Sequence, residues 1–176
     1  TALKRSVALL QCVTAYPVPP ESVNLRAMDT LSTTFGLPAG LSDHSTGTAI
    51  AIAAAARGAT IIEKHFTLDR ALPGPDHAAS LEPGELAAMV RAIRDVESAL
   101  GDGIKIPMPA EIPNISIARR GLVAACAIRK GEIITAKMIA SKRPLGQLSP
   151  MAWWEVVGHP ADRDYVLDEP IAAGKP

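Results

Sequence analysis

The sequence predicts an α/β fold in which the last three strand–helix units of a (β/α)₈ TIM barrel are followed by a small, mostly β domain. Strand and helix patterns alternate three times before residue 101, which predicts parallel strands joined by right-handed crossovers. Three buried parallel strands leave two open edges, whereas a closed barrel needs about 250 residues. Beyond residue 101 a proline-rich stretch and many turn signals predict a linker and a second domain.

Local sequence signals mark the helices and strands of the first region. Gly36, Gly58 and Gly101 each follow a helical pattern, as is typical of helix C-termini. Pro83 stands where the third helix begins, a position that proline favours. The strands are short apolar or β-branched runs, which suits buried parallel strands. We expect strands at residues 6–14, 39–42 and 60–66, and helices at about residues 28–35, 47–57 and 83–100.

The domain boundaries follow from the change in composition. We expect a partial barrel at residues 1–101, a linker at 102–114 and a second domain at 115–176. Short segments between Gly and Pro turns predict mostly β structure there, with one short helix near Trp153. A weak repeat relates two segments of this domain at an offset of 37 residues. It predicts two similar half-units, at residues 124–134 and 161–171.

Composition and charge exclude several classes of protein. The 18 Lys and Arg residues balance 18 Asp and Glu residues, and aromatic residues make up 3%, so no nucleic-acid partner is expected. The longest strongly apolar stretch, residues 49–56, is far too short to span a bilayer, so no membrane partner is expected. Cys12 and Cys126 cannot form a disulfide framework. A cytoplasmic location is therefore expected.

Polar residues gather where the predicted strands end, which is where barrel enzymes place their sites. His44 and His65 are 21 residues apart, about one strand–helix repeat, so they should occupy equivalent points on strands about 5 Å apart. Two imidazoles can then face one metal ion, and they suit Mn²⁺, Fe²⁺ or Zn²⁺ better than Ca²⁺. The alternative is that each is a satisfied core or capping histidine. Asp43 is a candidate to orient an imidazole.

Seven motifs resemble, in order and spacing, the sialic acid synthase family, which includes N-acetylneuraminate synthase and related spore-coat polysaccharide enzymes. The barrel part carries four of them, and the other three resemble the antifreeze-like SAF (β-clip) domain that follows the barrel in that family. They are LQCVTAYP at residues 10–17, GLSDHS at 40–45, IEKHFT at 62–67, GPDH at 74–77, ARRGLVA at 118–124, IRKGE at 128–132 and KRP at 142–144.

The resemblance implies condensation of phosphoenolpyruvate with N-acetylmannosamine, or a related amino sugar, to a nine-carbon sialic acid with release of phosphate. It implies that His44 and His65 ligate a divalent metal, Mn²⁺ in the first place with Mg²⁺ or Co²⁺ as alternatives. It also implies a homodimer in which the SAF domain is exchanged between subunits.

The resemblance further assigns substrate contacts. Tyr16, Ser42 and Asp76 would contact substrate, with Ser42 on the phosphoenolpyruvate side and Asp76 near the sugar hydroxyls. Thr14 would bind phosphate, in a position where some members have Asn. Arg143 would bind the acyl group of the amino sugar in the site of the other subunit.

The family's earlier strands supply lysines and glutamates that have no counterpart in this sequence, so we expect the chain alone to be inactive. Lys64 is the one strand-end lysine that could neutralise phosphoenolpyruvate. Two alternatives remain open. One is a non-catalytic fragment, a carbohydrate-binding or interaction module that carries an SAF domain. The other is an aldolase-type pyruvate lyase, which would need a Schiff-base lysine.

Overall fold

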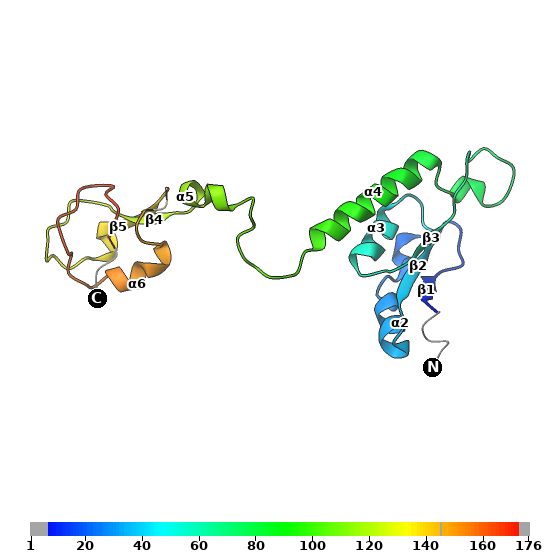
Figure 1. Ribbon diagram of the computed structural model, residues 1–176, viewed down its shortest axis with the longest axis horizontal. Coiled ribbons are helices and arrows are strands. Elements are labelled where there is room, and N and C mark those ends of the chain that lie inside the picture. The colour runs from blue at the N-terminus through cyan, green and yellow to red at the C-terminus, as the bar shows by residue number, and fades with distance from the viewer. Residues whose placement is uncertain (1–6, 145, 173–176) are drawn as a thin grey trace. The chain divides into compact units, whose positions relative to one another are not determined.

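The computed structural model describes residues 7–144 and 146–172 of the chain (Figure 1). Its internal contacts divide the chain into two compact units, the first ending at Ile104 and the second beginning at Lys105. Within the described ranges, no helix combines the length and the apolar character needed to cross a membrane.

The first unit is built on a parallel sheet of three strands in chain order. These are β1 (Leu9–Cys12), β2 (Ala39–Asp43) and β3 (Ile62–Lys64). The prediction of three parallel strands is confirmed, although β1 and β3 are shorter than predicted; Ser6, the first residue of the predicted strand, lies outside the described residues. The ladders are short, because β1 pairs with residues 39–42 of β2 and β3 pairs only with residues 41–43.

Four helices accompany these strands, and the longest agrees with its predicted bounds. Helix α4 (Pro83–Leu100) opens with a capping box between Glu82 and Glu85, which satisfies two backbone N–H groups at its start. Helix α2 (Ala27–Phe35) ends at Gly36, whose φ of 62° is readily adopted by glycine. Helix α3 (Ala49–Ala56) lies against both β2 and α4 (Figure 1). The fourth, α1 (Pro20–Val23), is a single turn after β1.

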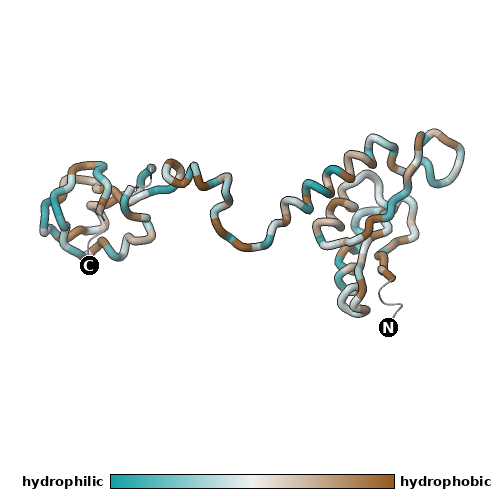
Figure 2. Tube along the Cα trace, in the orientation of Figure 1, coloured by the Kyte–Doolittle hydropathy of each residue, from teal (hydrophilic) through white to brown (hydrophobic). Residues whose placement is uncertain are grey.

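Small side chains let these layers approach closely. Ala51 and Ala54 of α3 are fully buried, Ala51 beside Met89 of α4 and Ala54 in the cluster that contains Leu41 of β2. Burial of this kind contributes about 25 cal/mol for each Å² of apolar surface removed from water. The chain leading into β1 from Val7 is strongly hydrophobic (Figure 2), yet Val7 is exposed. Apolar surface next to the start of β1 therefore remains exposed.

In the part of the second unit that the structure describes, one regular sheet is formed by the antiparallel strands β4 (Gly121–Ala124) and β5 (Ile139–Lys142). Short helices lie at its start and after the sheet: α5 (Ile115–Ala118) and α6 (Trp153–Val156). The short helix predicted near Trp153 is thus confirmed. Regular β structure is less extensive than predicted among the described residues, because the remaining segments are joined by isolated bridges rather than by continuous ladders.

The predicted repeat has a clear structural counterpart. Ile128 and Tyr165, which occupy equivalent positions in the two half-units, exchange backbone hydrogen bonds of 2.9 and 2.8 Å and are both buried. The Tyr165 hydroxyl donates to Asp162 at 2.5 Å and accepts from the Ala172 N–H at 3.2 Å. Burial raises the pKa of Tyr165, and its hydrogen bond to Asp162 acts in the same direction. The two half-units therefore meet at the centre of this unit's core.

Candidate functional site

Polar residues of the first unit meet at the carboxyl ends of β2 and β3, where a constant sequence offset aligns them. The parallel register pairs Ser42 with Glu63 and Asp43 with Lys64. His44 and His65 are the next residues along the two strands. The two predicted metal ligands are therefore brought to adjacent positions, as the spacing indicated.

The two imidazoles lie in one cluster with Tyr16. The ring centroids of His44 and His65 are 5.4 Å apart, with 63° between the ring planes. Tyr16 stacks on His44 at 4.1 Å and meets the edge of His65 at 5.3 Å. The ring of Tyr16 thus packs against both histidines and holds their imidazoles in defined orientations.

Hydrogen bonds determine which nitrogen of His44 carries the proton. Nδ1 lies 2.8 Å from the carbonyl oxygen of Val13, and because a carbonyl can only accept, Nδ1 carries the proton. The lone pair is then on Nε2, which is 3.1 Å from the Tyr16 hydroxyl and 3.5 Å from Ser42 Oγ. An imidazole anchored through one nitrogen to a backbone carbonyl is oriented as metal-ligating histidines usually are.

Ser42 also contacts a residue that the sequence analysis did not assign to the site. Its hydroxyl donates a hydrogen bond of 2.6 Å to Oε1 of Glu63. The signal for Glu63 was available, because residues 42 and 63 have the same offset of 21 as the two histidines. Glu63 therefore joins the candidate site as the partner of Ser42.

Two expectations for neighbouring residues are wrong. The Asp43 carboxylate is directed to Lys64 rather than to the imidazole of His44, and Lys64 is not free to neutralise a substrate, because the two form a buried ion pair at 2.8 Å with side chains 0% and 3% exposed. The reason is the alternation of side chains along a strand, which directs residues 43 and 64 away from the face that carries Ser42. A buried carboxylate requires a partner of opposite charge.

Asp76 reaches the histidines from the loop between β3 and α4. Its Oδ2 lies 4.0 Å from Nδ1 of His65, and its side chain is 58% exposed. The loop is closed by a hydrogen bond of 2.7 Å between Thr67 Oγ1 and Nδ1 of His77. Another, also 2.7 Å, runs from Ser80 Oγ to the carbonyl of Asp76. Asp76 is thus held beside His65 by contacts within its own loop.

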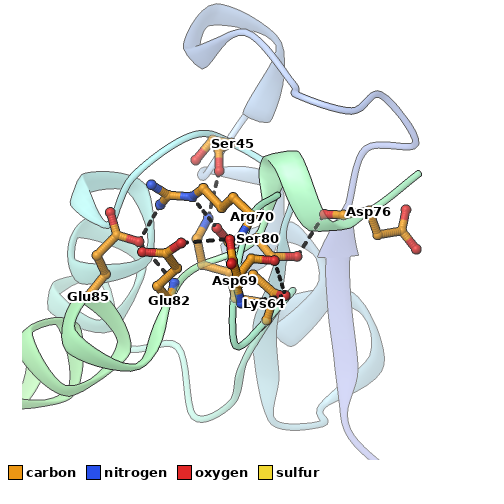
Figure 3. Close-up of polar contacts among 9 residues, drawn as sticks. Ser45, Lys64, Asp69, Arg70, Asp76, Ser80, Glu82 and Glu85 are labelled. Carbon is orange, nitrogen blue, oxygen red and sulfur yellow. Dashed lines mark hydrogen bonds and ion pairs between the residues drawn. The ribbon is translucent and has the colours of Figure 1, made fainter. Parts of the chain in front are cut away.

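Arg70 ties this loop to the first turn of α4 (Figure 3). Its Nε donates to the carbonyl of Ser80 at 3.0 Å, its backbone N–H donates to Glu82 at 3.1 Å, and its guanidinium pairs with Glu85. The hydrogen bond between the two side chains lowers the pKa of Glu85 and raises the pKa of Arg70.

Two predicted site residues stand apart from this cluster. Thr14 is exposed, two residues beyond the end of β1. Arg143 belongs to the second unit, directly after β5, where its Nε donates to the carbonyl of Ala118 at 2.6 Å. The residues that the structure brings together are Tyr16, Ser42, His44, His65 and Asp76.

The donor set fits a divalent transition metal in part. Two imidazoles converge, and the unprotonated Nε2 of His44, which lies 3.1 Å from the Tyr16 hydroxyl, is the kind of ligand atom that Mn²⁺, Co²⁺ and Zn²⁺ accept. Within residues 7–144 and 146–172, no three His, Cys, Asp or Glu side chains are grouped to hold an ion. The first unit therefore brings two imidazoles together, which is fewer side chains than a complete metal site needs.

Comparison with known proteins gives two family matches. Residues 1–105 match the NeuB family, and residues 119–175 match the SAF domain. The chain is 46% identical to N,N'-diacetyllegionaminic acid synthase of Campylobacter jejuni over 97% of this chain and 51% of that protein. It is 45% identical to human N-acetylneuraminate-9-phosphate synthase over 80% of this chain and 39% of that protein.

A solved structure is also similar. The N-acetylneuraminic acid synthetase of Leptospira borgpetersenii serovar Hardjo-bovis, determined in complex with citrate, is 44% identical, with a TM-score of 0.55 over 61% of this chain and 38% of that chain. The chain spans about half the length, or less, of these relatives. The resemblance that the motifs indicated is confirmed.

Proposed function

The chain belongs to the NeuB family, and from that premise we propose that it serves in a sugar-acid synthase. The reaction joins phosphoenolpyruvate to N-acetylmannosamine or a related N-acetylated amino sugar. A carbon–carbon bond forms between the enolpyruvyl carbon and the aldehyde carbon, water is consumed, and inorganic phosphate leaves. The product is a nine-carbon sugar acid. The observation that carries the proposal is the pair of imidazoles that meets at the strand ends.

In this proposal His44 and His65 hold a divalent metal, with Mn²⁺ the first choice and Mg²⁺ or Co²⁺ the alternatives. Such an ion, when bound, polarises the aldehyde oxygen of the sugar. The hydrogen bond from His44 Nδ1 to the Val13 carbonyl supports this assignment, because it leaves the lone pair on Nε2, the atom that would bind the metal, and fixes the orientation of the ring. The stacked ring of Tyr16 limits rotation of the same imidazole.

The other residues are proposed to bind the two substrates. Ser42 faces the phosphoenolpyruvate side. Glu63 accepts a hydrogen bond from its hydroxyl, and this contact fixes the direction of the oxygen lone pairs of Ser42. Asp76 carries an exposed carboxylate close to His65, and such a group can accept hydrogen bonds from sugar hydroxyls. Thr14 offers a hydroxyl for phosphate, and Tyr16 lines the space beside the histidines.

Arg143 is proposed to bind the acyl group of the amino sugar in the site of the partner subunit of a homodimer. Its guanidinium is exposed in the second unit, and among the residues that the structure describes it is engaged only through Nε, which donates to the Ala118 carbonyl. The remaining guanidinium N–H groups are therefore donors that a carbonyl oxygen of the substrate can use.

The first test concerns catalysis. The purified chain is incubated with phosphoenolpyruvate, N-acetylmannosamine and Mn²⁺, alone and with the amino-terminal half of a family member. Phosphate and sugar acid are both measured. We expect no turnover by the chain alone, because Lys64 is occupied by Asp43, and measurable turnover once the other half is supplied. Sugar-acid formation by the chain alone would contradict this expectation.

The second test concerns the histidines. Metal content of the complex formed by the two halves is measured for the parent chain, for His65→Ala and for Gly84→Ala. Gly84 lies in α4 with open space around the position of a Cβ, so it is a matched control. His65→Ala should lose most of the bound metal and the turnover, while Gly84→Ala keeps both. Unchanged metal stoichiometry in His65→Ala would remove the metal assignment.

A further inference from the structure

We infer that the buried ion pair between Asp43 and Lys64 is a positioning device that sets the separation of His44 and His65. The inference rests on the proposed function, because it concerns the residues proposed to hold the metal. Asp43 and Lys64 are positioning residues: they touch neither the ion nor the substrate in this proposal. They act through the backbone of the residues that follow them.

The contacts of the pair form a closed connection between β2 and β3. Lys64 Nζ donates to Asp43 Oδ2 at 2.8 Å and to the carbonyl of Ser45 at 2.7 Å. Asp43 Oδ1 accepts from the Ser45 N–H at 2.9 Å and from its hydroxyl at 2.6 Å. The residues on both sides of His44 are therefore joined to the residue before His65.

This connection lies where the backbone ladder stops. The register between β2 and β3 ends at the pair Asp43 and Lys64. His44 and His65 follow that last pair, so no further ladder hydrogen bond aligns them with each other. Their separation then depends on the side-chain contacts at the end of the ladder and on the loops beyond it.

Stability alone does not account for an ion pair at this place. Removing two charges from water costs about as much as their attraction returns, and an apolar pair of similar volume often serves a core equally well. An ion pair differs from an apolar contact in its fixed length and direction. Buried polar groups of this kind are best attested as devices that specify one register. Here the register that matters is the one that places two imidazoles side by side.

The test uses a double variant, Asp43→Asn with Lys64→Met, in the 176-residue chain. It removes both charges and keeps an oxygen to which Ser45 can donate. Three quantities are measured: the melting temperature, the affinity for Co²⁺ by calorimetric titration, and the nuclear Overhauser effect between the two imidazole rings without metal. We expect a folded protein, Co²⁺ affinity lowered at least about tenfold, as for lost supporting contacts in metal sites, and loss of the ring-to-ring signal.

A matched control separates positioning from general destabilisation. Met89→Ala removes a buried side chain of α4 that does not touch the site, so it should lower the melting temperature with Co²⁺ affinity unchanged. An equal loss of affinity in Met89→Ala would overturn the inference. So would a folded double variant that keeps both the affinity and the ring-to-ring signal.

Two further variants cover the remaining outcomes. Should the double variant not fold, Ser45→Ala removes one hydrogen bond of the connection, and it should weaken Co²⁺ binding by a smaller factor of about two to five; unchanged affinity would then refute the inference. His65→Ala tests the proposed function separately. If that variant binds Co²⁺ as the parent does, the metal site is wrong, and the ring-to-ring signal of the double variant still decides whether the ion pair positions the histidines.

Discussion

Replacing Gly40 with alanine is expected to disrupt the centre of the parallel sheet. A Cβ at this position would lie 2.3 Å from the carbonyl oxygen of Ile61 and 2.7 Å from a methyl group of Leu10. Because Cβ atoms in proteins essentially never approach closer than 3.0 Å, the Ile61 carbonyl must move by about 0.7 Å. That oxygen accepts the hydrogen bond from the Leu41 N–H at 3.0 Å, so the ladder between β2 and β3 is strained where it begins.

The cost can be estimated from two terms. Overpacking of a filled core costs about 1–3 kcal/mol, and a weakened buried hydrogen bond adds about 1 kcal/mol. A total of about 2–4 kcal/mol corresponds to a melting temperature about 10–20 °C lower for a unit of this size. Since residues 41–43 pair with residues 62–64, the shift should also reach the ends of the strands.

Thermal unfolding followed by calorimetry and circular dichroism measures this effect on the first unit. Gly84→Ala is the matched control, because nothing lies within 4 Å of its added Cβ. In a helix that change should leave stability equal or higher by up to about 1 kcal/mol. A melting temperature for Gly40→Ala within about 3 °C of the parent would refute the reasoning, since the sheet would then accommodate a side chain that its geometry excludes.

Three other predictions concern the loop, the second unit and assembly. Arg70→Gln should speed thermolysin cleavage within residues 67–80, because Arg70 joins that loop to α4. In the parent, the contribution of Glu85 to this contact is complete above the ordinary carboxyl pKa of about 4.3. Because the pKa of Glu85 is lowered in the fold, that contribution is lost as pH falls through the lowered value, so amide hydrogen exchange of residues 67–80, followed from pH 6 to pH 3 and corrected for its intrinsic pH dependence, should accelerate only near the acid end. Tyr165→Phe should destabilise the second unit by about 1–2 kcal/mol in calorimetry, since Asp162 and the Ala172 N–H each lose a partner; an unchanged transition would contradict this. Light scattering of dilute protein should show self-association through the exposed apolar surface near Val7, and a monomer without concentration dependence would remove that expectation together with the proposed exchange of SAF domains.

Short-range patterns determined much of the fold from sequence. The limits of α4 follow from Pro83 at its start and Gly101 after its end, and both are local signals that act wherever the segment lies. The adjacency of His44 and His65 could be predicted for a related reason: an offset of 21 residues in consecutive strand–helix units brings equivalent positions together in a parallel sheet. The motifs carried the family assignment, which the comparisons confirmed.

What only the tertiary structure decided is how each polar side chain is used. Ser42, Asp43 and His44 are consecutive, but the pleat directs Asp43 into a buried contact with Lys64 and Ser42 toward Glu63. Sequence alone could not assign these partners, because the energy of a charge depends on its burial and on its neighbours across the sheet. Sequence alone also did not predict the strand ends: β1 pairs only with residues 39–42 of β2 and β3 only with residues 41–43, and this register is set by contacts between strands rather than by local sequence. Spacing along the chain therefore predicted which residues meet, and burial determined whether each one supports the fold or remains free for chemistry.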